Sequence, residues 1–449
     1  MKRPVGGTAG LVLVSVIGTG YLGATHAACL AACGHEVVGV DSSRERVATL
    51  AEGRAPFHEP GLEPLLREGV RSGRLRFTTE CADAAGAEAH FLCVGTPQRP
   101  GSHAADLSSL DAAVGSLAPV LTTPTVVVGK STVPVGTARR IGERLRAEAP
   151  AADDVAVAWN PEFLREGHAV HDSLHPDRLV FGVEDDESDQ VLRDVYAPMI
   201  NSGVPVVRTD LPTAELAKVS ANVMLAARIS LVNLLAEVCE VASADVGDLT
   251  RILGLDERIG DKFLTPGVGF GGGCLPKDTR AFVARAEELG LAGPAAVLRE
   301  VDALNMRQRA RTIDRAVRML GGRVDGRQVA VLGAAFKAGS DDVRDSPALD
   351  VATTLQARGA RVRVHDPQAG SNVRRVAPAL DVAETVEQAC RDADVVLVLT
   401  DWDEFRGIDP VALAATVRHP RVVDGRLVLD PDKWRAAGWD FHALGRGGS

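Results

Sequence analysis

Residues 13–23 read Leu13-Val14-Ser15-Val16-Ile17-Gly18-Thr19-Gly20-Tyr21-Leu22-Gly23. An apolar run of strand length leads directly into a G-x-G-x-x-G motif, and helix-forming residues follow. In such a unit the first glycine permits a tight turn, the second lets a pyrophosphate approach the backbone, and the third lets the helix pack closely. The stretch predicts a dinucleotide-binding βαβ unit. Its cofactor-binding candidates are Gly18, Gly20, Tyr21, Leu22 and Gly23.

A carboxylate stands where this motif needs one. Asp41 ends the next apolar run, residues 37–40, at the position where an acid can bind the adenosine ribose hydroxyls. A negative charge there repels the 2′-phosphate of NADP, so NAD is the predicted cofactor. The nearby Arg44 and Arg46 leave NADP open as an alternative, and Arg46 joins the cofactor-binding candidates.

Outward from this unit, short β-rich runs alternate with helical stretches, which is typical of a parallel sheet covered on both faces. Strands are predicted at residues 13–17, 36–40, 90–94, 125–130, 155–159 and 178–182, and again at 328–332, 360–365 and 394–399. Between them, residues 212–244 read as one long helix. The fold class is α/β, with two Rossmann-like, doubly wound parallel-sheet domains joined by a central helical region.

Four segments follow from this pattern. Residues 1–10 are expected to be a disordered leader, 11–210 an NAD-binding domain, 211–319 a central helical region that carries a cysteine loop, and 320–449 the second Rossmann-like domain. The apolar run before Gly18 mimics a signal peptide, but cleavage would destroy the glycine motif. We expect no segment to be long enough to span a membrane.

Composition narrows the class of protein. The chain has 449 residues, of which 45% are hydrophobic and 24% charged, as in ordinary globular proteins of several domains. A net charge of −10 makes nucleic acid an unfavourable partner. The seven cysteines form no C-x-x-C pair, which argues against a disulfide framework or a zinc ribbon and fits the reducing cytoplasm.

Two further motifs follow predicted strands in this half of the chain. They are Val94-Gly95-Thr96-Pro97 and Lys130-Ser131-Thr132-Val133-Pro134-Val135-Gly136-Thr137. Open α/β sheets bind ligands at the carboxyl ends of their strands, so these segments could line the nicotinamide side. Each, taken alone, also has the composition of an ordinary turn.

The richest stretch is Gly267-Val268-Gly269-Phe270-Gly271-Gly272-Gly273-Cys274-Leu275-Pro276-Lys277-Asp278. Its glycines indicate close approach of the backbone to a ligand. A thiol just before a helical pattern, which is predicted to start near Asp278, and close to Lys277 has features that favour a nucleophilic thiolate. The alternative is that Cys274 is a small buried apolar residue, as most lone cysteines are.

Other polar residues allow two interpretations each. Lys218 and Asn222 are four apart on the predicted long helix and could converge on one oxygen, or form its solvated face. Glu162 and Glu166 follow a strand and could activate water or bind ribose, or be surface charges. His168, His171 and His175 match no strong zinc pattern, so no metal is predicted.

The loop after residues 328–332 offers a phosphate-binding candidate, Lys337, with Asp341, Asp342 and Arg344 beyond it. Gly333 and Phe336 do not complete a dinucleotide fingerprint, so a second NAD site is not expected.

In this order and spacing, the motifs resemble those of the UDP-glucose/GDP-mannose dehydrogenase family. They are GTGYLG at 18, VGTP at 94, STVPVGT at 131, NPEFLREG at 160, ELAKVSAN at 215, RIGDKFLTPGVGFGGGCLPKD at 258 and LGAAFKAGSDDVRDSP at 332. The resemblance spans nearly the whole chain. It implies an NAD-binding domain, a central dimerisation region and a C-terminal domain that binds a sugar nucleotide.

The resemblance also implies roles for single residues. The catalytic candidates are the nucleophile Cys274 with Lys218, Asn222, Asp278, Thr132 and Glu162. Further cofactor contacts are Thr96, Ser131, Thr132, Glu166, Lys277 and Arg344. The substrate candidates are Glu162, Phe163, Leu164, Lys218, Asn222, Phe263, Leu264, Gly267, Phe270, Gly271 and Lys337, with Arg258 contributed across a homodimer interface.

The function that this resemblance implies is two-step oxidation of the C6 alcohol of UDP-glucose to UDP-glucuronate, through a thiohemiacetal and a thioester on Cys274. TDP-glucose and GDP-mannose remain alternative substrates for the same chemistry. A single-step sugar-nucleotide reductase or epimerase is the competing reaction, since it needs no cysteine.

Overall fold

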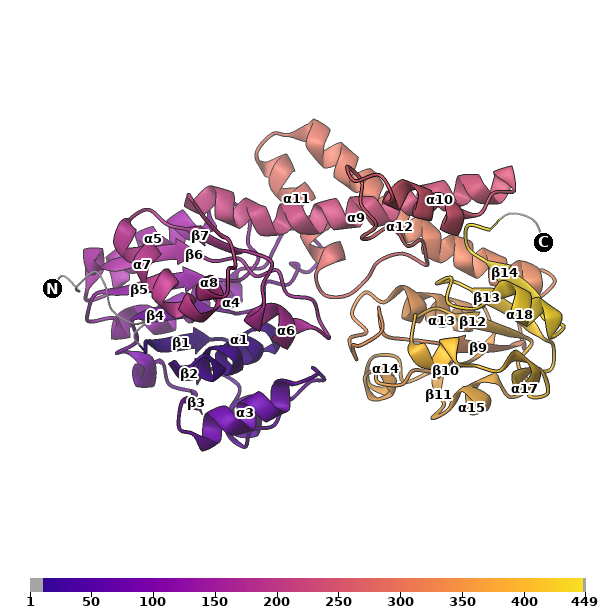
Figure 1. Cartoon of the computed structure of the whole chain (residues 1–449), viewed down its shortest axis with the longest axis horizontal. Coiled ribbons are helices and arrows are strands. Elements are labelled where there is room, and N and C mark those ends of the chain that lie inside the picture. The colour runs from indigo at the N-terminus through magenta and orange to yellow at the C-terminus, as the bar shows by residue number, and fades with distance from the viewer. Residues whose placement is uncertain (1–10, 447–449) are drawn as a thin grey trace. The chain divides into compact units, whose positions relative to one another are not determined.

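The structure, a computed structural model, describes residues 11–446. The leader expected at residues 1–10 lies outside the described residues. Backbone contacts divide the chain into two compact units, with Ala221 as the last residue of the first unit and Asn222 as the first of the second. Each unit contains one parallel or mostly parallel sheet, drawn from indigo to magenta and from orange to yellow in Figure 1.

The sheet of the first unit has eight strands in the order β3-β2-β1-β4-β5-β6-β7-β8. The strands are β1 (Leu13–Ile17), β2 (Glu36–Val40), β3 (Leu75–Thr78), β4 (Ala89–Leu92), β5 (Thr125–Gly129), β6 (Val155–Trp159), β7 (Leu179–Gly182) and β8 (Val206–Thr209). The first six are parallel, with Ile17 opposite Val40 and opposite Leu92. The strand order reverses at β1, which makes the gap between the ends of β1 and β4 a ligand-binding position.

Three details of this sheet differ from the sequence prediction. The short edge strands β3 and β8 were not predicted. The β7 strand is antiparallel to β6, where Trp159 pairs with Gly182, so the sheet is not entirely parallel. Strand periodicity carries no information on direction, and short edge strands have little apolar signal.

Helices cover both faces of this sheet because its strands are apolar on both faces. Val14 and Val16 of β1 pack in one core, and Leu13 and Ile17 pack in the other. The helices are α1 (Tyr21–Ala32), α2 (Arg44–Ala51), α3 (Leu62–Arg71), α4 (Ser108–Leu117), α5 (Thr137–Glu148), α6 (Ala169–Leu174), α7 (Asp186–Val195) and α8 (Ala197–Asn201), with 3₁₀ turns at Cys81–Ala84, Ala118–Val120 and Ala152–Asp154.

The sheet of the second unit is fully parallel, in the order β11-β10-β9-β12-β13-β14. Its strands are β9 (Gln328–Leu332), β10 (Arg361–His365), β11 (Asp381–Val382), β12 (Val395–Val398), β13 (Arg421–Asp424) and β14 (Asp440–Ala443). Its helices are α10 (Val246–Gly254), α11 (Leu275–Glu288), α12 (Ala292–Met319), α13 (Pro347–Ala357), α14 (Gly370–Val376), α15 (Val386–Cys390), α16 (Asp403–Arg406), α17 (Pro410–Ala414) and α18 (Pro431–Ala436). Two Rossmann-like sheets and a helical middle confirm the predicted fold class.

A carboxylate, Asp366, also follows β10 in the second sheet, but its oxygens already accept hydrogen bonds from the protein. Asp366 accepts hydrogen bonds from the backbone N–H groups of Ala334 (2.7 Å) and Ala335 (2.9 Å) and from Nε1 of Trp402 (3.1 Å). A carboxylate at this point in a dinucleotide site has to meet ribose hydroxyls. Here the N–H groups of Ala334, Ala335 and Trp402 bind the carboxylate where ribose hydroxyls would have to bind.

The long helix α9 runs from Leu211 to Ala242 (Figure 1). By length and composition it could cross a membrane, so the statement that no segment is long enough was wrong. Part of its most apolar window is buried in the protein, and Glu215 and Lys218 are buried polar residues on the same helix. Near its end, Glu240 binds Arg311 and Arg315. These features are typical of a core helix.

The start of α11 also differs from expectation. The helix begins at Leu275, not near Asp278, because Pro276 fits the first turn of a helix, where its missing N–H costs nothing. Cys274 is therefore the N-cap residue of α11.

Candidate active site

The turn after β1 in the first unit is closely packed on one side and open on the other. A Cβ at Gly23 would lie 1.8 Å from the carbonyl oxygen of Gly18, so only glycine permits this approach of α1 to the turn. A Cβ at Gly20 would meet no atom within 4 Å. The open space lies at a helix N-terminus, whose N–H groups and dipole bind phosphate. The turn fits the pyrophosphate of a dinucleotide.

Asp41 lies beside this turn and is held as a carboxylate. It accepts hydrogen bonds from the N–H groups of Thr19 (2.8 Å) and Ser43 (2.9 Å) and from Nη1 of Arg46 (2.9 Å). Burial acts to raise the pKa of Asp41, but these hydrogen bonds outweigh it and hold the pKa below its ordinary value. An ionised Asp41 suits a ribose diol and opposes a 2′-phosphate. The guanidinium of Arg46, which the sequence left open as a contact for the phosphate of NADP, is bound to Asp41.

Tyr21 makes a contact that the sequence did not predict. Its hydroxyl donates to Glu59, and the N–H of Gly167 donates to the Tyr21 oxygen (3.0 Å) and to Glu59 (2.8 Å). Burial first, and then the bond to Glu59, raises the pKa of Tyr21 far above its ordinary value. These bonds tie the loop that carries Glu166 to the first turn of α1.

The loops after β4 and β5 are joined by their hydroxyl groups. Ser131 donates to the carbonyl oxygen of Val94 (2.7 Å), and Thr96 donates to that of Thr132 (2.7 Å). The structure therefore brings Thr96, Ser131 and Thr132 together at the ligand-binding end of the sheet. The hydroxyls of Ser131 and Thr96 fix the loops through these bonds.

Glu162 and Lys218 form a buried ion pair in the first unit. Nζ of Lys218 lies 3.0 Å from Oε1 of Glu162, and Oε2 of Glu162 accepts from the N–H of Leu164 (2.6 Å). The ring of Phe163 lies beneath the guanidinium of Arg178, at 3.8 Å from its centroid. This arrangement supplies an amine and a carboxylate, each of which can exchange a proton.

In the second unit, Cys274 is exposed at the N-terminus of α11. Asp278 lies one turn further on, is buried, and accepts from Nδ2 of Asn222 (2.6 Å) and from Nζ of Lys277. Lys277, expected at the cofactor, thus contacts Asp278. A helix N-terminus favours a thiolate over a thiol, so the position of Cys274 suits a nucleophile.

The glycine loop before Cys274 is held without room for side chains. A Cβ at Gly271 would lie 2.4 Å from the carbonyl oxygen of Asp345, and a Cβ at Gly273 would lie 2.4 Å from Cζ of Arg344. Asn305 binds both backbone groups of Phe270, at 2.7 Å and 3.0 Å. Arg344 itself pairs with Asp342 (2.6 Å).

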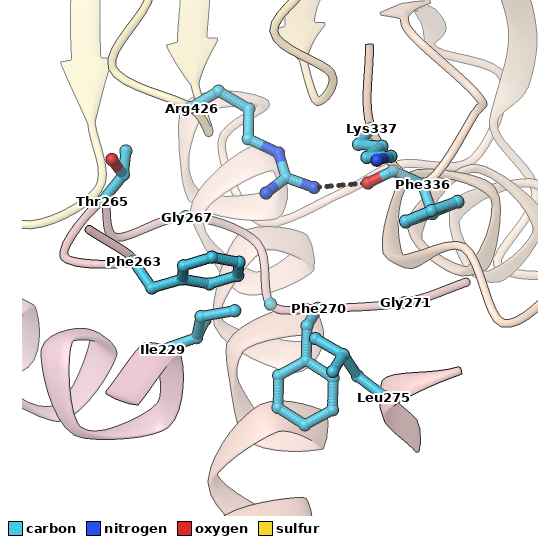
Figure 2. A pocket seen from close by; sticks show the side chains of 11 residues that line it. Ile229, Phe263, Thr265, Gly267, Phe270, Gly271, Leu275, Phe336, Lys337 and Arg426 are labelled. Atoms are coloured by element: carbon cyan, nitrogen blue, oxygen red, sulfur yellow. Dashed lines mark hydrogen bonds between the residues drawn. The ribbon is translucent and has the colours of Figure 1, made fainter. Parts of the chain in front are cut away.

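A cavity of about 340 Å³ opens beside this loop (Figure 2). It is lined by Ile229, Phe263, Thr265, Gly267, Gly269, Phe270, Gly271, Leu275, Phe336, Lys337 and Arg426. The guanidinium of Arg426 donates to the carbonyl oxygens of Leu399 (2.9 Å) and Phe336 (3.2 Å), the latter drawn in Figure 2. Two cations among aromatic and apolar side chains suit a ligand that carries both phosphate and a ring.

The structure separates the predicted substrate residues into two groups. Phe263, Gly267, Phe270, Gly271 and Lys337 line the cavity. Three other candidates of the second unit do not: Leu264 is buried, Asn222 binds Asp278 (2.6 Å), and Arg258 is exposed and pairs with Asp256 (2.6 Å). The remaining candidates belong to the first unit: Glu162, Phe163, Leu164 and Lys218. Within residues 11–446, no three His, Cys, Asp or Glu side chains are grouped to hold a metal ion.

Arg426 was missed by the sequence analysis, although a signal was available. It stands two residues after Asp424, the last residue of β13, and the carboxyl ends of parallel strands carry ligand contacts. Asn305 and Glu59 left no such signal, because the groups that they bind lie far along the chain: Phe270 for Asn305, and Tyr21 and Ala169 for Glu59.

Comparison with known proteins gives one consistent result. Three family models match, all of the UDP-glucose/GDP-mannose dehydrogenase family: its NAD-binding domain at residues 12–200, its central domain at 212–307 and its UDP-binding domain at 330–431. UDP-glucose 6-dehydrogenases of Rhizobium meliloti and Pseudomonas aeruginosa are 41% and 40% identical, over 96% of this chain and 99% and 97% of theirs. The solved structure of a UDP-glucose dehydrogenase from Pyrobaculum islandicum has a TM-score of 0.91 at 36% identity, covering 99% of this chain and 100% of that one.

Proposed function

The chain belongs to the UDP-glucose/GDP-mannose dehydrogenase family, and we propose that it oxidises the C6 alcohol of UDP-glucose to UDP-glucuronate. The observation that carries the proposal is the exposed thiol of Cys274 at the N-terminus of α11, directly after the loop that lines the cavity. The names of the curated relatives support the choice of sugar nucleotide.

NAD, which the N-terminal domain of this family binds, supplies the hydride acceptor for both oxidations. The turn at Gly18 to Gly23 would hold its pyrophosphate, and Asp41 its adenosine ribose. In the first oxidation the proton of the C6 hydroxyl passes to Lys218 or to a water held by Asp278. The product of this step is an aldehyde at C6.

Cys274 then forms the covalent intermediate. Its thiolate attacks the aldehyde carbon, a C–S bond forms, and the carbonyl electron pair moves to oxygen, giving the oxyanion of a thiohemiacetal. Loss of the C6 hydride converts this to a thioester. Water positioned by Thr132, with Glu162 or Asp278 as base, breaks the C–S bond and releases the uronate and the thiolate. Lys218 and Asn222 stabilise the negative oxygen in these steps.

The cavity supports a nucleoside diphosphate as the carrier of the sugar. Lys337 and Arg426 provide positive charge for phosphate, and Phe263, Phe270 and Phe336 provide apolar surface for a base. Uracil and thymine differ by one methyl group, which a pocket discriminates by only about 1–3 kcal/mol. TDP-glucose therefore remains the nearest competitor, and GDP-mannose the next.

We also propose a homodimer that forms through α9. Met224, Leu231 and Val238 are exposed apolar side chains at seven-residue intervals, so they lie along one stripe of the helix, with Val241 exposed at its end. An exposed apolar stripe of this kind marks an interaction surface. Arg258, which is exposed and outside the cavity lining, is proposed to reach the substrate of the partner subunit.

Location and domain limits complete the proposal. The seven cysteines, all within the described residues, form no disulfide, which supports a cytoplasmic enzyme. We take residues 11–210, 211–319 and 320–449 as the NAD-binding, central and sugar-nucleotide-binding domains. The limits of the three matching family models support this division.

The test is the stoichiometry of NADH release. Wild-type protein should release two NADH for each UDP-glucose consumed, with no free aldehyde, because Cys274 captures the intermediate in place. Cys274→Ser should still bind UDP-glucose but lose uronate formation, since an alcohol is a far weaker nucleophile than a thiolate. Cys33→Ser is the matched control, because it makes the same change at a half-buried cysteine that lies far from Cys274 in the sequence. One NADH per substrate would favour the single-step reaction, and uronate formation by Cys274→Ser would remove Cys274 from the mechanism.

A further inference from the structure

Lys130 is a buried cation at the end of β5 that the proposed mechanism does not use. Its Nζ donates to Oδ1 of Asn160 (2.9 Å) and lies 3.1 Å from the hydroxyl of Tyr196. The Tyr196 hydroxyl also donates to Oδ1 of Asn160 (2.5 Å), and Nδ2 of Asn160 donates to the carbonyl oxygen of Val180 (3.0 Å). The hydrogen-bond partners of the ammonium are thus a neutral amide and a neutral phenol.

The surroundings of Lys130 are otherwise aromatic. Nζ lies 5.9 Å from the ring centroid of Phe91 and 5.6 Å from that of Tyr196, and the ring of His26 lies 4.7 Å from that of Phe91. Burial lowers the pKa of Lys130 to about 8, the charge of Lys218 acts in the same direction, and Glu162 opposes it. At neutral pH the side chain still carries its proton. Because burial of the Lys130 ammonium costs desolvation free energy, this residue is a candidate for a functional role.

The cluster is connected directly to the proposed proton-exchanging pair. Asn160, which Lys130 binds, is followed by Pro161 and then by Glu162, whose carboxylate contacts Lys218 at 3.0 Å. The coupling between two charges acts on both of them. The positive charges of Lys130 and Lys218 therefore oppose each other, and the carboxylate of Glu162 offsets the charge of Lys130.

The other titratable groups near Lys130 are neutral at pH 7. Burial raises the pKa of Cys93 to about 12 and raises that of Tyr196 well above its ordinary value. Burial, followed by the charge of Lys130, lowers the pKa of His26 well below its ordinary value. Arg178 is a further cation near the pair: its guanidinium lies 3.8 Å from the ring centroid of Phe163, and Nζ of Lys218 lies 5.9 Å from the same centroid. The charge that the cluster itself contributes is that of Lys130.

We propose that Lys130 is a positioning residue for the Lys218–Glu162 pair: it anchors the turn that carries Glu162 through Asn160, and its buried positive charge acts on the positive charge of Lys218. The kinetic consequence rests on the proposed oxidation of UDP-glucose, and on Lys218 rather than the water held by Asp278 as the acceptor of the C6 hydroxyl proton. The electrostatic consequence concerns the unliganded protein and does not depend on the substrate.

Lys130→Met tests the charge, because methionine fills a similar apolar volume without it. In the unliganded protein, the Lys218 side chain can be followed by ¹³Cε NMR of lysine-labelled protein as the pH is raised. Lys2, Lys130, Lys218, Lys262, Lys277, Lys337 and Lys433 are its lysines, so the spectrum is small, and Lys218→Arg assigns the signal. In Lys130→Met, Lys218 should titrate at higher pH than in wild type. The acid limb of the kcat/KM profile for UDP-glucose should move the same way, with on the order of 3- to 10-fold lower activity at pH 7.

Tyr196→Phe and Lys130→Arg are the matched controls. Tyr196→Phe removes a hydroxyl from the same cluster but keeps the charge, and Lys130→Arg keeps the charge in another shape. Both should leave the Lys218 titration near that of wild type. An unchanged titration in Lys130→Met would overturn the inference, and so would an equal shift in Tyr196→Phe, which would assign the effect to packing. A wild-type protein that does not oxidise UDP-glucose would contradict the proposed function, while the titration would still decide the role of Lys130.

Discussion

Asp41 is the buried residue that we expect to select the cofactor. Its carboxylate stays ionised because the Thr19 and Ser43 N–H groups and Arg46 bind it, despite the cost of burial. The same charge that suits ribose hydroxyls repels a 2′-phosphate. Because the pKa of Asp41 is lowered, we expect this discrimination to be fully present at neutral pH and to be lost only as the pH falls through that lowered pKa.

We predict that Asp41→Ser reduces the preference for NAD over NADP. The substitution removes the repulsion and releases Arg46, whose guanidinium can then meet a phosphate. The ratio of kcat/KM for NAD to that for NADP should fall by roughly tenfold or more, which corresponds to about 1.4 kcal/mol. Glu52→Gln, which removes an exposed carboxylate paired with Arg54, should leave the ratio unchanged. An unchanged ratio in Asp41→Ser would show that another group selects the cofactor.

Arg426 is a charged residue of the cavity that the sequence analysis missed. Burial lowers its pKa, yet a guanidinium remains charged under all ordinary conditions. Its bonds to the carbonyl oxygens of Leu399 and Phe336 fix the side chain toward the cavity before any ligand binds. A preorganised charge of this kind loses little entropy on binding a phosphate.

We predict that Arg426→Met weakens binding of UDP, measured by calorimetry, by roughly 10- to 100-fold. Charge-assisted hydrogen bonds contribute about 1.5–3 kcal/mol, which accounts for this range. Arg406→Met, at an exposed arginine that pairs with Asp403, is the control and should bind UDP as wild type does. Equal UDP affinity in both variants would place the diphosphate outside this cavity.

At the scale of elements, the glycine loop and α11 act as one unit. The loop is held by Asn305 on α12 and by the segment around Asp345, and α11 begins directly after it. A fixed loop determines where the thiol of Cys274 stands relative to the helix N-terminus. Rigid support of this kind is what a reacting group requires.

We predict that Gly271→Ala disrupts this unit. The added Cβ would lie 2.4 Å from the carbonyl oxygen of Asp345, so the loop or its partner has to move. Uronate formation should fall at least about tenfold, since small displacements at a reacting centre have effects of that size. Gly293→Ala, on α12, is the matched control because its Cβ would meet no atom within 4 Å. Equal activity and equal melting temperature in the two variants would show that the loop is not constrained.

At the scale of the whole molecule, the proposed homodimer depends on the exposed stripe of α9. We predict that Leu231→Glu, which places a charge in the centre of the stripe, shifts the protein to a monomer in sedimentation at micromolar concentration. Val411→Glu, which changes an exposed apolar residue of α17, is the matched control and should not change the oligomeric state.

If Arg258 serves the partner subunit, the Leu231→Glu monomer and Arg258→Ala should both have a raised KM for UDP-glucose. Full activity in a wild-type monomer would contradict the shared site.

The sequence by itself determined the features that depend on local pattern. The strands Leu13–Ile17, Glu36–Val40 and Val155–Trp159 were predicted to the residue, because apolar runs bounded by glycine and charged residues are local signals. The glycine motif and Asp41 predicted the NAD-binding domain that the family match confirms. The order and spacing of the motifs pointed to the family before any side chain was placed.

Only the tertiary structure decided which residues meet at long range. Three hydrogen bonds join segments that lie far apart in the chain: Trp402 to Asp366, Phe270 to Asn305, and Arg426 to Phe336. The antiparallel direction of β7 likewise depends on its pairing with β6. The ammonium of Lys130 is a further case, because in the sequence it is one polar residue before Ser131 and Thr132. It is buried among Phe91 of β4, Asn160 after β6 and Tyr196 after α7, which come together only when these elements pack. Local pattern records which residues form a strand, whereas the energy of a buried charge depends on every group that packs around it.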